Sequence, residues 1–229
     1  MMFKRIKRIL FRICLGFLGL SIFSVIIFRF IPIPITPLMI LRCMEQFTEG
    51  KDLALHKDWT CLEKISPVMP LAVIAAEDQN FEEHFGFDLE AIKKAESYND
   101  KHKGKRLKGA STISQQTAKN LFLWPSRSWI RKGFEVYFTF LIEVLWSKKR
   151  IMEVYLNVIE TGNGIYGVEA ASQIYFKKPS SKLSINESAR LAAILPNPLN
   201  WSPVNPSQRV ARKAGRIVHF IGKLKTENF

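Results

Sequence analysis

A chain of 229 residues has room for one well-packed domain and an accessory segment, and is too short for two full domains of ordinary size. Hydrophobic residues make up 47% of it, so either the core is large or part of the chain contacts lipid. The formal charge of +14 predicts an anionic partner: nucleic acid, phospholipid headgroups or a phosphorylated substrate. The three Cys and four His residues lack metal-ligand spacing, which argues against a zinc site.

The N-terminus has the pattern of a membrane anchor. Five basic residues and no acidic one precede residue 13, and residues 13–28 are uncharged. Apolar residues on both sides lengthen this stretch toward the roughly 20 residues that span a bilayer. By the positive-inside rule, residues 1–12 form a cytoplasmic basic tail, residues 13–35 a transmembrane anchor with a Pro-rich linker, and residues 36–229 a periplasmic domain.

A cleaved signal peptide is the competing interpretation, because it shares the basic start and the apolar core. No small-x-small cleavage site follows, and the chain continues into the Pro-rich stretch 29–37, so a retained anchor is favoured. Nucleic acid is absent from the far side of the membrane, which leaves phospholipids and lipid pyrophosphates as partners. Cys43 and Cys61 could there form a disulfide or remain two thiols.

Beyond the linker, apolar residues recur at helical spacing, which predicts one mainly α-helical domain. Helices are expected at residues 71–76, 88–97, 112–121, 129–146 and 150–159, and before Pro196 after a capping box that begins at Ser184. A basic amphipathic helix is expected from about residue 206. Residues 99–109 are charged and punctuated by Gly, which predicts a loop.

Two segments carry groups suited to sugar and phosphate chemistry. Glu77 and Asp78 follow an apolar helix, where an acidic pair is ordinarily a solvated cap. Ser111, Gln115 and Lys119 are spaced by four, so one helix face would present a hydroxyl, an amide and a cation. Such a row is typical either of an ordinary solvent-exposed helix face or of a site that binds sugar and phosphate.

The predicted helix 129–146 is apolar nearly all round, which indicates burial in protein or contact with lipid. Its exceptions, Arg131, Glu135, Thr139 and Glu143, are spaced by four and form one stripe. Carboxylates in apolar surroundings need partners or a function. Arg131 and Glu135 therefore form either a structural pair or part of a site.

Five ordered patterns carry a family resemblance: Glu77-Asp-x-x-Phe-x-x-His-x-Gly86, Gly109-x-Ser-Thr-Ile-x-Gln-Gln-x-x-Lys-Asn120, Arg131-Lys-x-x-Glu135, Lys149-Arg-Ile-Met-Glu153-x-Tyr-Leu-Asn157 and Arg190-Leu-Ala-Ala-x-Leu-Pro-Asn-Pro198. In this order they closely resemble the family 51 glycosyltransferases, and among these the monofunctional biosynthetic peptidoglycan transglycosylases. The resemblance runs from about residue 71 to residue 203, and the N-terminal anchor matches as well.

The resemblance implies a lysozyme-like helical domain that extends glycan chains from lipid II, with inversion to a β-1,4 bond and release of undecaprenyl pyrophosphate. Glu77 matches the general base, and Glu135 the second essential carboxylate, which would organise Arg131, the pyrophosphate or a divalent cation such as Mg²⁺. Lys119 and Arg127 match the residues that hold the donor pyrophosphate. The surrounding sugar and phosphate contacts match Ser111, Gln115, Gln116 and Asn120. No cofactor is otherwise implied.

The chain lacks the Ser-x-x-Lys and Lys-Thr-Gly motifs of a transpeptidase, so cross-linking falls to another protein, and other cell-wall synthases are candidate partners. Residues 162–167 formally fit a dinucleotide fingerprint, but no βαβ pattern surrounds them. Two alternatives remain: a peptidoglycan-cleaving enzyme, which would not need the cations Lys119 and Arg127, and a noncatalytic membrane-anchored scaffold.

Overall fold

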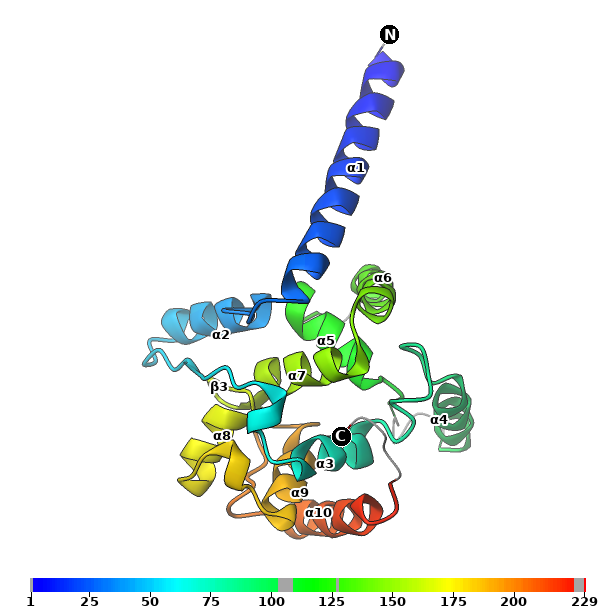
Figure 1. Cartoon of the computed structure of the whole chain (residues 1–229). Coiled ribbons are helices and arrows are strands. Elements are labelled where there is room, and N and C mark those ends of the chain that lie inside the picture. Colours follow the sequence, from blue (N-terminus) through cyan, green and yellow to red (C-terminus); the bar gives the residue numbers. More distant parts are fainter. Residues whose placement is uncertain (1, 103–108, 127, 225–228) are drawn as a thin grey trace.

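The computed structural model describes residues 2–102, 109–126, 128–224 and 229. In it a long helix, α1, projects from a mainly helical globular part (Figure 1). The elements follow in this order: α1 Met2–Phe28, α2 Pro37–Thr48, β1 His56–Lys57, η1 Leu62–Lys64, α3 Val68–Glu77, α4 Leu89–Lys101, α5 Ile113–Phe122, α6 Trp129–Leu145, α7 Lys148–Val158, β2 Glu160–Gly162, β3 Ile165–Tyr166, α8 Val168–Phe176, η2 Ser180–Lys182, α9 Ile185–Ile194 and α10 Gln208–Ile221. The prediction of a mainly α-helical protein is confirmed.

Helix α1 is long and apolar enough to cross a membrane. It is the only such helix among the described residues. Its segment Phe3–Phe28 has 26 residues and contains an 18-residue stretch with a mean hydropathy of 2.3. At 1.5 Å per residue it is about 39 Å long, which exceeds the roughly 30 Å hydrocarbon core of a bilayer. The expected apolar extension after Phe28 is not helical; the helix instead continues backward through the basic residues to Met2. The length and composition of α1 are thus consistent with a single-pass anchor.

The C-terminal half of α1 packs against the globular part. Ser21 Oγ lies 2.7 Å from the Tyr137 hydroxyl of α6, and the Trp146 indole donates a hydrogen bond of 2.8 Å to the carbonyl of Val25. The guanidinium of Arg150 donates to the carbonyl of Phe28 at 2.7 Å, which satisfies one of the free carbonyls at the end of the helix. These bonds fix the direction in which α1 leaves the domain.

The globular core lies between two helical groups. Helices α5, α6 and α7 pack together on the α1 side, and α3, α9 and α10 pack together on the opposite side (Figure 1). Fully buried large residues such as Tyr155, Met152 and Phe81 fill the space between helices. The site described below lies where the end of α3 meets α5.

A small sheet, which the sequence did not predict, has the strand order β1-β3-β2, with β1 parallel and β2 antiparallel to β3. Strands of two or three residues are too short for an alternating pattern to be recognised. Gly164 forms the turn between β2 and β3 with φ of +67°, where an added Cβ would lie 2.3 Å from the carbonyl oxygen of Ala54.

The predicted helices are confirmed with shifts of a few residues at their ends, the largest being the extension of the helix predicted at 88–97 to Lys101. The predicted loop 99–109 is therefore wrong at its start, while residues 103–108 lie outside the described residues. Cys43 and Cys61, for which two states were open, are free thiols.

Candidate active site

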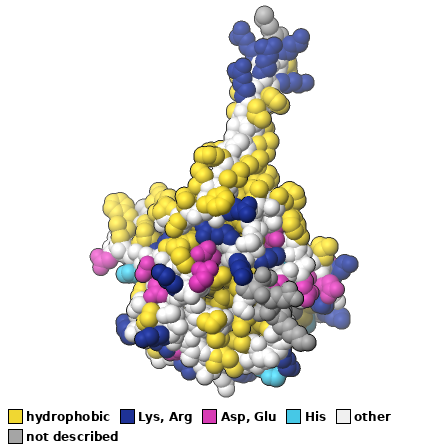
Figure 2. Space-filling model, viewed as in Figure 1, with side chains coloured by type: hydrophobic (Ala, Val, Ile, Leu, Met, Phe, Trp, Pro, Cys, Tyr) yellow, Lys and Arg dark blue, Asp and Glu magenta, His cyan; other side chains and the backbone are white. Residues whose placement is uncertain are grey.

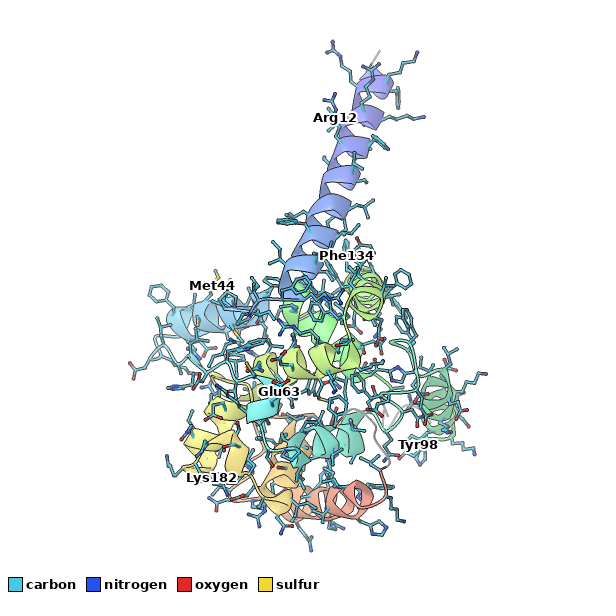
Figure 3. The ribbon with its side chains drawn as sticks, viewed as in Figure 1. Arg12, Met44, Glu63, Tyr98, Phe134 and Lys182 are labelled. Atoms are coloured by element: carbon cyan, nitrogen blue, oxygen red, sulfur yellow. The ribbon has the colours of Figure 1, made fainter. Side chains whose placement is uncertain are left out.

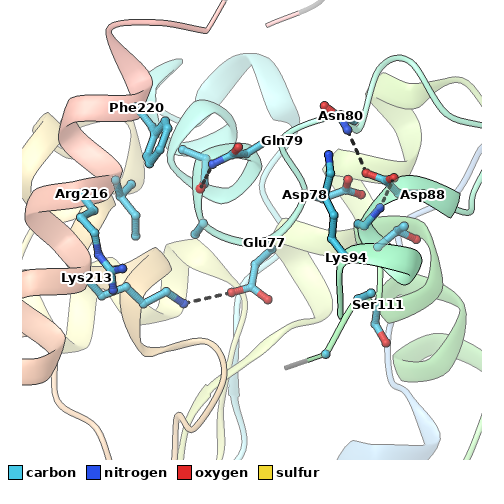
Figure 4. Close-up of a pocket in the computed structure, with 17 residues that line it drawn as sticks. Glu77, Asp78, Gln79, Asn80, Asp88, Lys94, Ser111, Lys213, Arg216 and Phe220 are labelled. Carbon is cyan, nitrogen blue, oxygen red and sulfur yellow. Dashed lines mark hydrogen bonds and ion pairs between the residues drawn. The ribbon is translucent and has the colours of Figure 1, made fainter. Parts of the chain in front are cut away.

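Glu77 is the last residue of α3, and its carboxylate has two polar partners, of which Figure 4 shows Lys213. Its Oε2 accepts a hydrogen bond from Gln116 Nε2 at 3.1 Å, and its Oε1 lies 3.3 Å from Lys213 Nζ. The side chain remains 14% exposed. Glu77 is therefore held in place by α5 and α10 and still reaches solvent.

Asp78, the other member of the acidic pair, is buried and has structural partners. One oxygen accepts the backbone N–H of Ile113 at 2.9 Å, and His84 Nε2 donates to the other oxygen at the same distance. A carboxylate at the N-terminus of a helix satisfies a free N–H and interacts favourably with the helix dipole. Asp78 thus fixes the start of α5 beside Glu77.

The predicted polar row of Ser111, Gln115 and Lys119 is wrong in part, because Ser111 precedes α5 and only Gln115 and Lys119 lie on the helix. Thr112 is the N-cap of α5 and Gln115 closes a capping box with it, accepting the Thr112 N–H at 3.0 Å. Gln115 is therefore buried, whereas Ser111 precedes the helix and is exposed. Of these three residues, Lys119 alone lies on the helix and lines a cavity.

Two cavities meet at the Glu77–Gln116 hydrogen bond. The first, of about 500 Å³, contains Glu77 and Ser111, and its other wall is formed by Lys213, Arg216 and Phe220 of α10 (Figure 4). The second, of about 610 Å³, lies between α2, α5 and α6. The cationic and amide residues that line this second cavity are Arg42, Gln116, Lys119, Asn120 and Arg131.

Lys119 is partly buried and lies near several charged side chains. Burial lowers the pKa of its ammonium, attraction to Glu135 opposes that change, and repulsion from Arg131 and Lys132 adds to it. Several cations concentrated in a partly desolvated space attract an anion strongly, since the low dielectric increases every charge interaction. The second cavity is therefore suited to a phosphate or pyrophosphate group.

Glu135 organises the cations at the edge of this cavity. Its side chain is only 4% exposed, and its oxygens contact Arg131 at 2.6 Å and Lys132 at 2.5 Å. Arg131 and Glu135 therefore form an ion pair, as one of the two alternatives had it, and Arg131 also lines the second cavity. The described residues contain no group of three or more His, Cys, Asp and Glu side chains that could hold a metal ion. Because both oxygens of Glu135 already contact cations, this carboxylate is a poor fit for Mg²⁺.

The other site residues fall into three groups: one outside the described residues, two that line a cavity and two that the sequence did not predict. Arg127 lies outside the described residues. Gln116 and Asn120 line the second cavity, and their role as substrate contacts stays a prediction. Lys213 and Arg216 were missed, although α10 had been recognised as a basic amphipathic helix, because no local pattern indicates which surface such a helix packs against.

Comparison with known proteins decides the family. The profile of the family described as Transglycosylase matches residues 44–221. A biosynthetic peptidoglycan transglycosylase of Mannheimia succiniciproducens is 54% identical over 91% of this chain and 85% of its own length. Proteins of the same description from Bacteroides thetaiotaomicron and Cronobacter sakazakii are 49% and 48% identical, over 95% and 100% of this chain and 87% and 94% of their own lengths.

The chain belongs to the family of biosynthetic peptidoglycan transglycosylases. The resemblance carried by the five sequence patterns is thereby confirmed. Membership in a family of biosynthetic enzymes also argues against the two alternatives, a peptidoglycan-cleaving enzyme and a noncatalytic scaffold. In this transglycosylase, the hydrogen bond between Glu77 and Gln116 links the cavity that contains Glu77 with the cavity lined by Gln116 and Lys119.

Proposed function

We propose that this transglycosylase uses Glu77 as the general base that deprotonates the sugar 4-hydroxyl during chain extension from lipid II. The chain is a peptidoglycan glycosyltransferase and polymerises glycan chains, as its family membership shows. A hydroxyl is a poor nucleophile unless a positioned base takes its proton in the transition state. The observation that carries the proposal is the position of Glu77, partly exposed at the junction of the two cavities.

The proton balance of the step follows from this position. As the acceptor 4-oxygen attacks the anomeric carbon of the donor, its proton passes to Glu77 and the bond to undecaprenyl pyrophosphate breaks with its electron pair leaving on the pyrophosphate. The attack inverts the anomeric carbon and forms a β-1,4 bond. Lys213 and Gln116 hold the carboxylate in place for the transfer.

The cations of the second cavity are proposed to bind the donor pyrophosphate. Lys119 and Arg131 line that cavity, and Arg127 is assigned the same role from the sequence resemblance. Positioned cations stabilise the negative charge that grows on the leaving group as the bond breaks. Glu135 acts through Arg131 and Lys132, which it orients, and takes no proton itself.

Sugar and phosphate contacts are assigned to the amide and hydroxyl residues. Ser111 lies in the first cavity, and Gln116 and Asn120 lie in the second. Gln115 supports them indirectly, since its side chain caps α5. The growing glycan strand and other cell-wall synthases remain proposed partners, and nucleic acid is not among them.

The topology proposed for the chain places the catalytic domain, residues 36–229, in the periplasm. The basic tail 1–12 would stay in the cytoplasm, with residues 13–35 as anchor and linker. Exposed apolar side chains near α1 support contact with lipid: Trp124, Trp129 and Ile130 are exposed. Phe122 and Phe138, by contrast, stack on each other with ring centroids 4.4 Å apart.

The activity is tested by incubating detergent-purified protein with lipid II. We expect a polymer that lysozyme digests, and polymerisation by Glu77→Gln that is slower by roughly 100-fold or more. Topology is tested separately by a reporter fused after Phe229 and by a carbonate wash. A periplasmic reporter on a full-length, membrane-bound chain is expected; recovery of a shortened soluble protein would support the signal-peptide alternative.

A further inference from the structure

Helix α2 is firmly attached to the domain through one face. Met39 is fully buried, and Gln46 Oε1 accepts the backbone N–H of Ala54 at 2.8 Å. Arg42 Nε donates to Glu160 at 3.2 Å. Thr36 caps the start of the helix and Pro37 occupies its first position, where its missing N–H costs nothing. The orientation of α2 is therefore fixed by contacts along its length.

The opposite face of α2 is apolar and exposed. Ile40, Met44 and Phe47 are spaced as i, i+4 and i+7 and form one stripe, with 46%, 58% and 76% of their surfaces exposed. With Ile35 and Leu53 they line a shallow hollow of about 350 Å³. Contiguous apolar surface of this kind is uncommon on soluble monomers and marks an interaction site.

This stripe faces outward at the same end of the molecule as the apolar helix α1. Helix α2 starts nine residues after α1 ends, and it extends sideways from the base of α1 (Figure 1). Met44 of α2 and Phe134 of α6 lie at that end, and Lys182 lies at the opposite end (Figure 3). Hydrophobic side chains gather around the base of α1 on both sides (Figure 2).

We propose that α2 lies flat in the membrane interface and inserts Ile40, Met44 and Phe47 among the acyl chains. The proposal rests on the proposed anchoring by α1, because the lipid surface is continuous with the bilayer that α1 would span. Amphipathic helices bury such a face at the boundary between headgroups and acyl chains.

The charges near the stripe favour acyl chains over anionic headgroups as the partner. Arg42 pairs with Glu45 at 2.8 Å, and Lys51 pairs with Glu49 at 2.6 Å. These four residues carry no net charge, so the stripe has no basic flank to attract anionic lipid. Insertion is therefore expected in neutral bilayers.

The insertion has a consequence for the active site, because α2 also forms part of the second cavity. Leu38 and Arg42 line it across from Lys119 and Arg131. A helix fixed at the membrane surface would hold the opening of this cavity near the headgroups. A pyrophosphate attached to a membrane-bound lipid lies at that height.

The test uses the full-length chain with its three native Cys residues replaced by Ala and single nitroxide labels introduced by Met44→Cys, Phe47→Cys, Glu45→Cys or Lys182→Cys. The protein is reconstituted in neutral phosphatidylcholine vesicles. Depth is measured from accessibility of the label to oxygen and to a water-soluble nickel chelate. Labels at 44 and 47 should favour oxygen, and labels at 45 and 182 should favour the nickel chelate. All four positions are exposed, so labelling should leave the fold unchanged.

A fifth label, at Leu20→Cys on the exposed surface of α1, separates the two hypotheses. If this label is in lipid while those at 44 and 47 are in water, the proposal for α2 is overturned and the anchor stands. If the label at 20 is itself in water, the anchor fails and α2 loses its support. Insertion of 44 and 47 only in vesicles with anionic lipid would overturn the assignment to acyl chains.

Discussion

The two cavities that meet at Glu77 and Gln116 differ in charge and in position. The first is lined by carboxylates and cations together, among them Glu77, Asp78, Lys213 and Arg216. The second has three cations, Arg42, Lys119 and Arg131, against one carboxylate, Glu160, which pairs with Arg42, and it lies next to the helices around the base of α1. The proposed function assigns proton transfer to the first cavity and pyrophosphate binding to the second.

Among the variants that test these two roles, Glu77→Gln is expected to have the largest effect. The substitution keeps the shape and the hydrogen-bonding capacity of the side chain and removes the base, so turnover should fall by roughly 100-fold or more. Donor binding should survive, because the second cavity is untouched, and the melting temperature should stay near that of the parent. Steady-state polymerisation and binding measurements on lipid II provide the check.

Glu83→Gln is the matched control, since Glu83 belongs to the same segment, is exposed and lines neither cavity. It should polymerise at the parent rate. Parent-rate polymer from Glu77→Gln would place the base elsewhere, with Glu135 as the next candidate.

Lys119→Ala should act mainly on the second cavity. Loss of one charge-assisted contact of about 1.5–3 kcal/mol corresponds to roughly 10- to 100-fold weaker donor binding. Turnover should fall as well, because pyrophosphate charge is stabilised more strongly as the bond breaks. Arg127→Ala should change both quantities in the same direction. Lys182→Ala, at the far end of the molecule, should change neither; a Lys119→Ala enzyme with unchanged donor affinity would contradict the assignment.

Asp78→Asn tests the acidic pair by separating stability from catalysis. The amide cannot accept both the Ile113 N–H and the His84 hydrogen bond as the carboxylate does, so the free energy of unfolding should drop by about 1–3 kcal/mol. Thermal unfolding measures the effect, with Glu77→Gln as the comparison. Equal melting temperatures for the two variants would show that Asp78 does not hold the start of α5.

The smallest effect concerns pH. Burial lowers the pKa of Lys119 below its ordinary value of 10.5, and only the protonated form attracts pyrophosphate. Donor affinity should therefore be full below that lowered pKa and decline as the pH rises through it. Lys119→Arg should remove the decline, because a guanidinium stays charged. An identical alkaline decline in the parent and in Lys119→Arg would assign it to another group.

Local patterns predicted most of the helices, and the reason is that apolar spacing and caps act over a few residues. The capping box at Ser184 and the apolar stretch of α1 were recognisable without any partner. The strands β1, β2 and β3 were not, because two or three residues contain too little pattern. Helix ends moved by a few residues, since terminal turns are settled by contacts from other elements.

The sequence by itself determined the helical class, the N-terminal apolar helix and the family, because five ordered patterns are specific even where each one is weak. The tertiary structure decided which partners the individual residues have. Asp78 accepts the backbone N–H of Ile113, whereas Glu77 contacts Lys213, which lies 136 positions away in the sequence. The side chain of Gln115 caps the start of α5. Such assignments depend on which helix faces pack together, and packing is a property of the whole chain that no local spacing encodes.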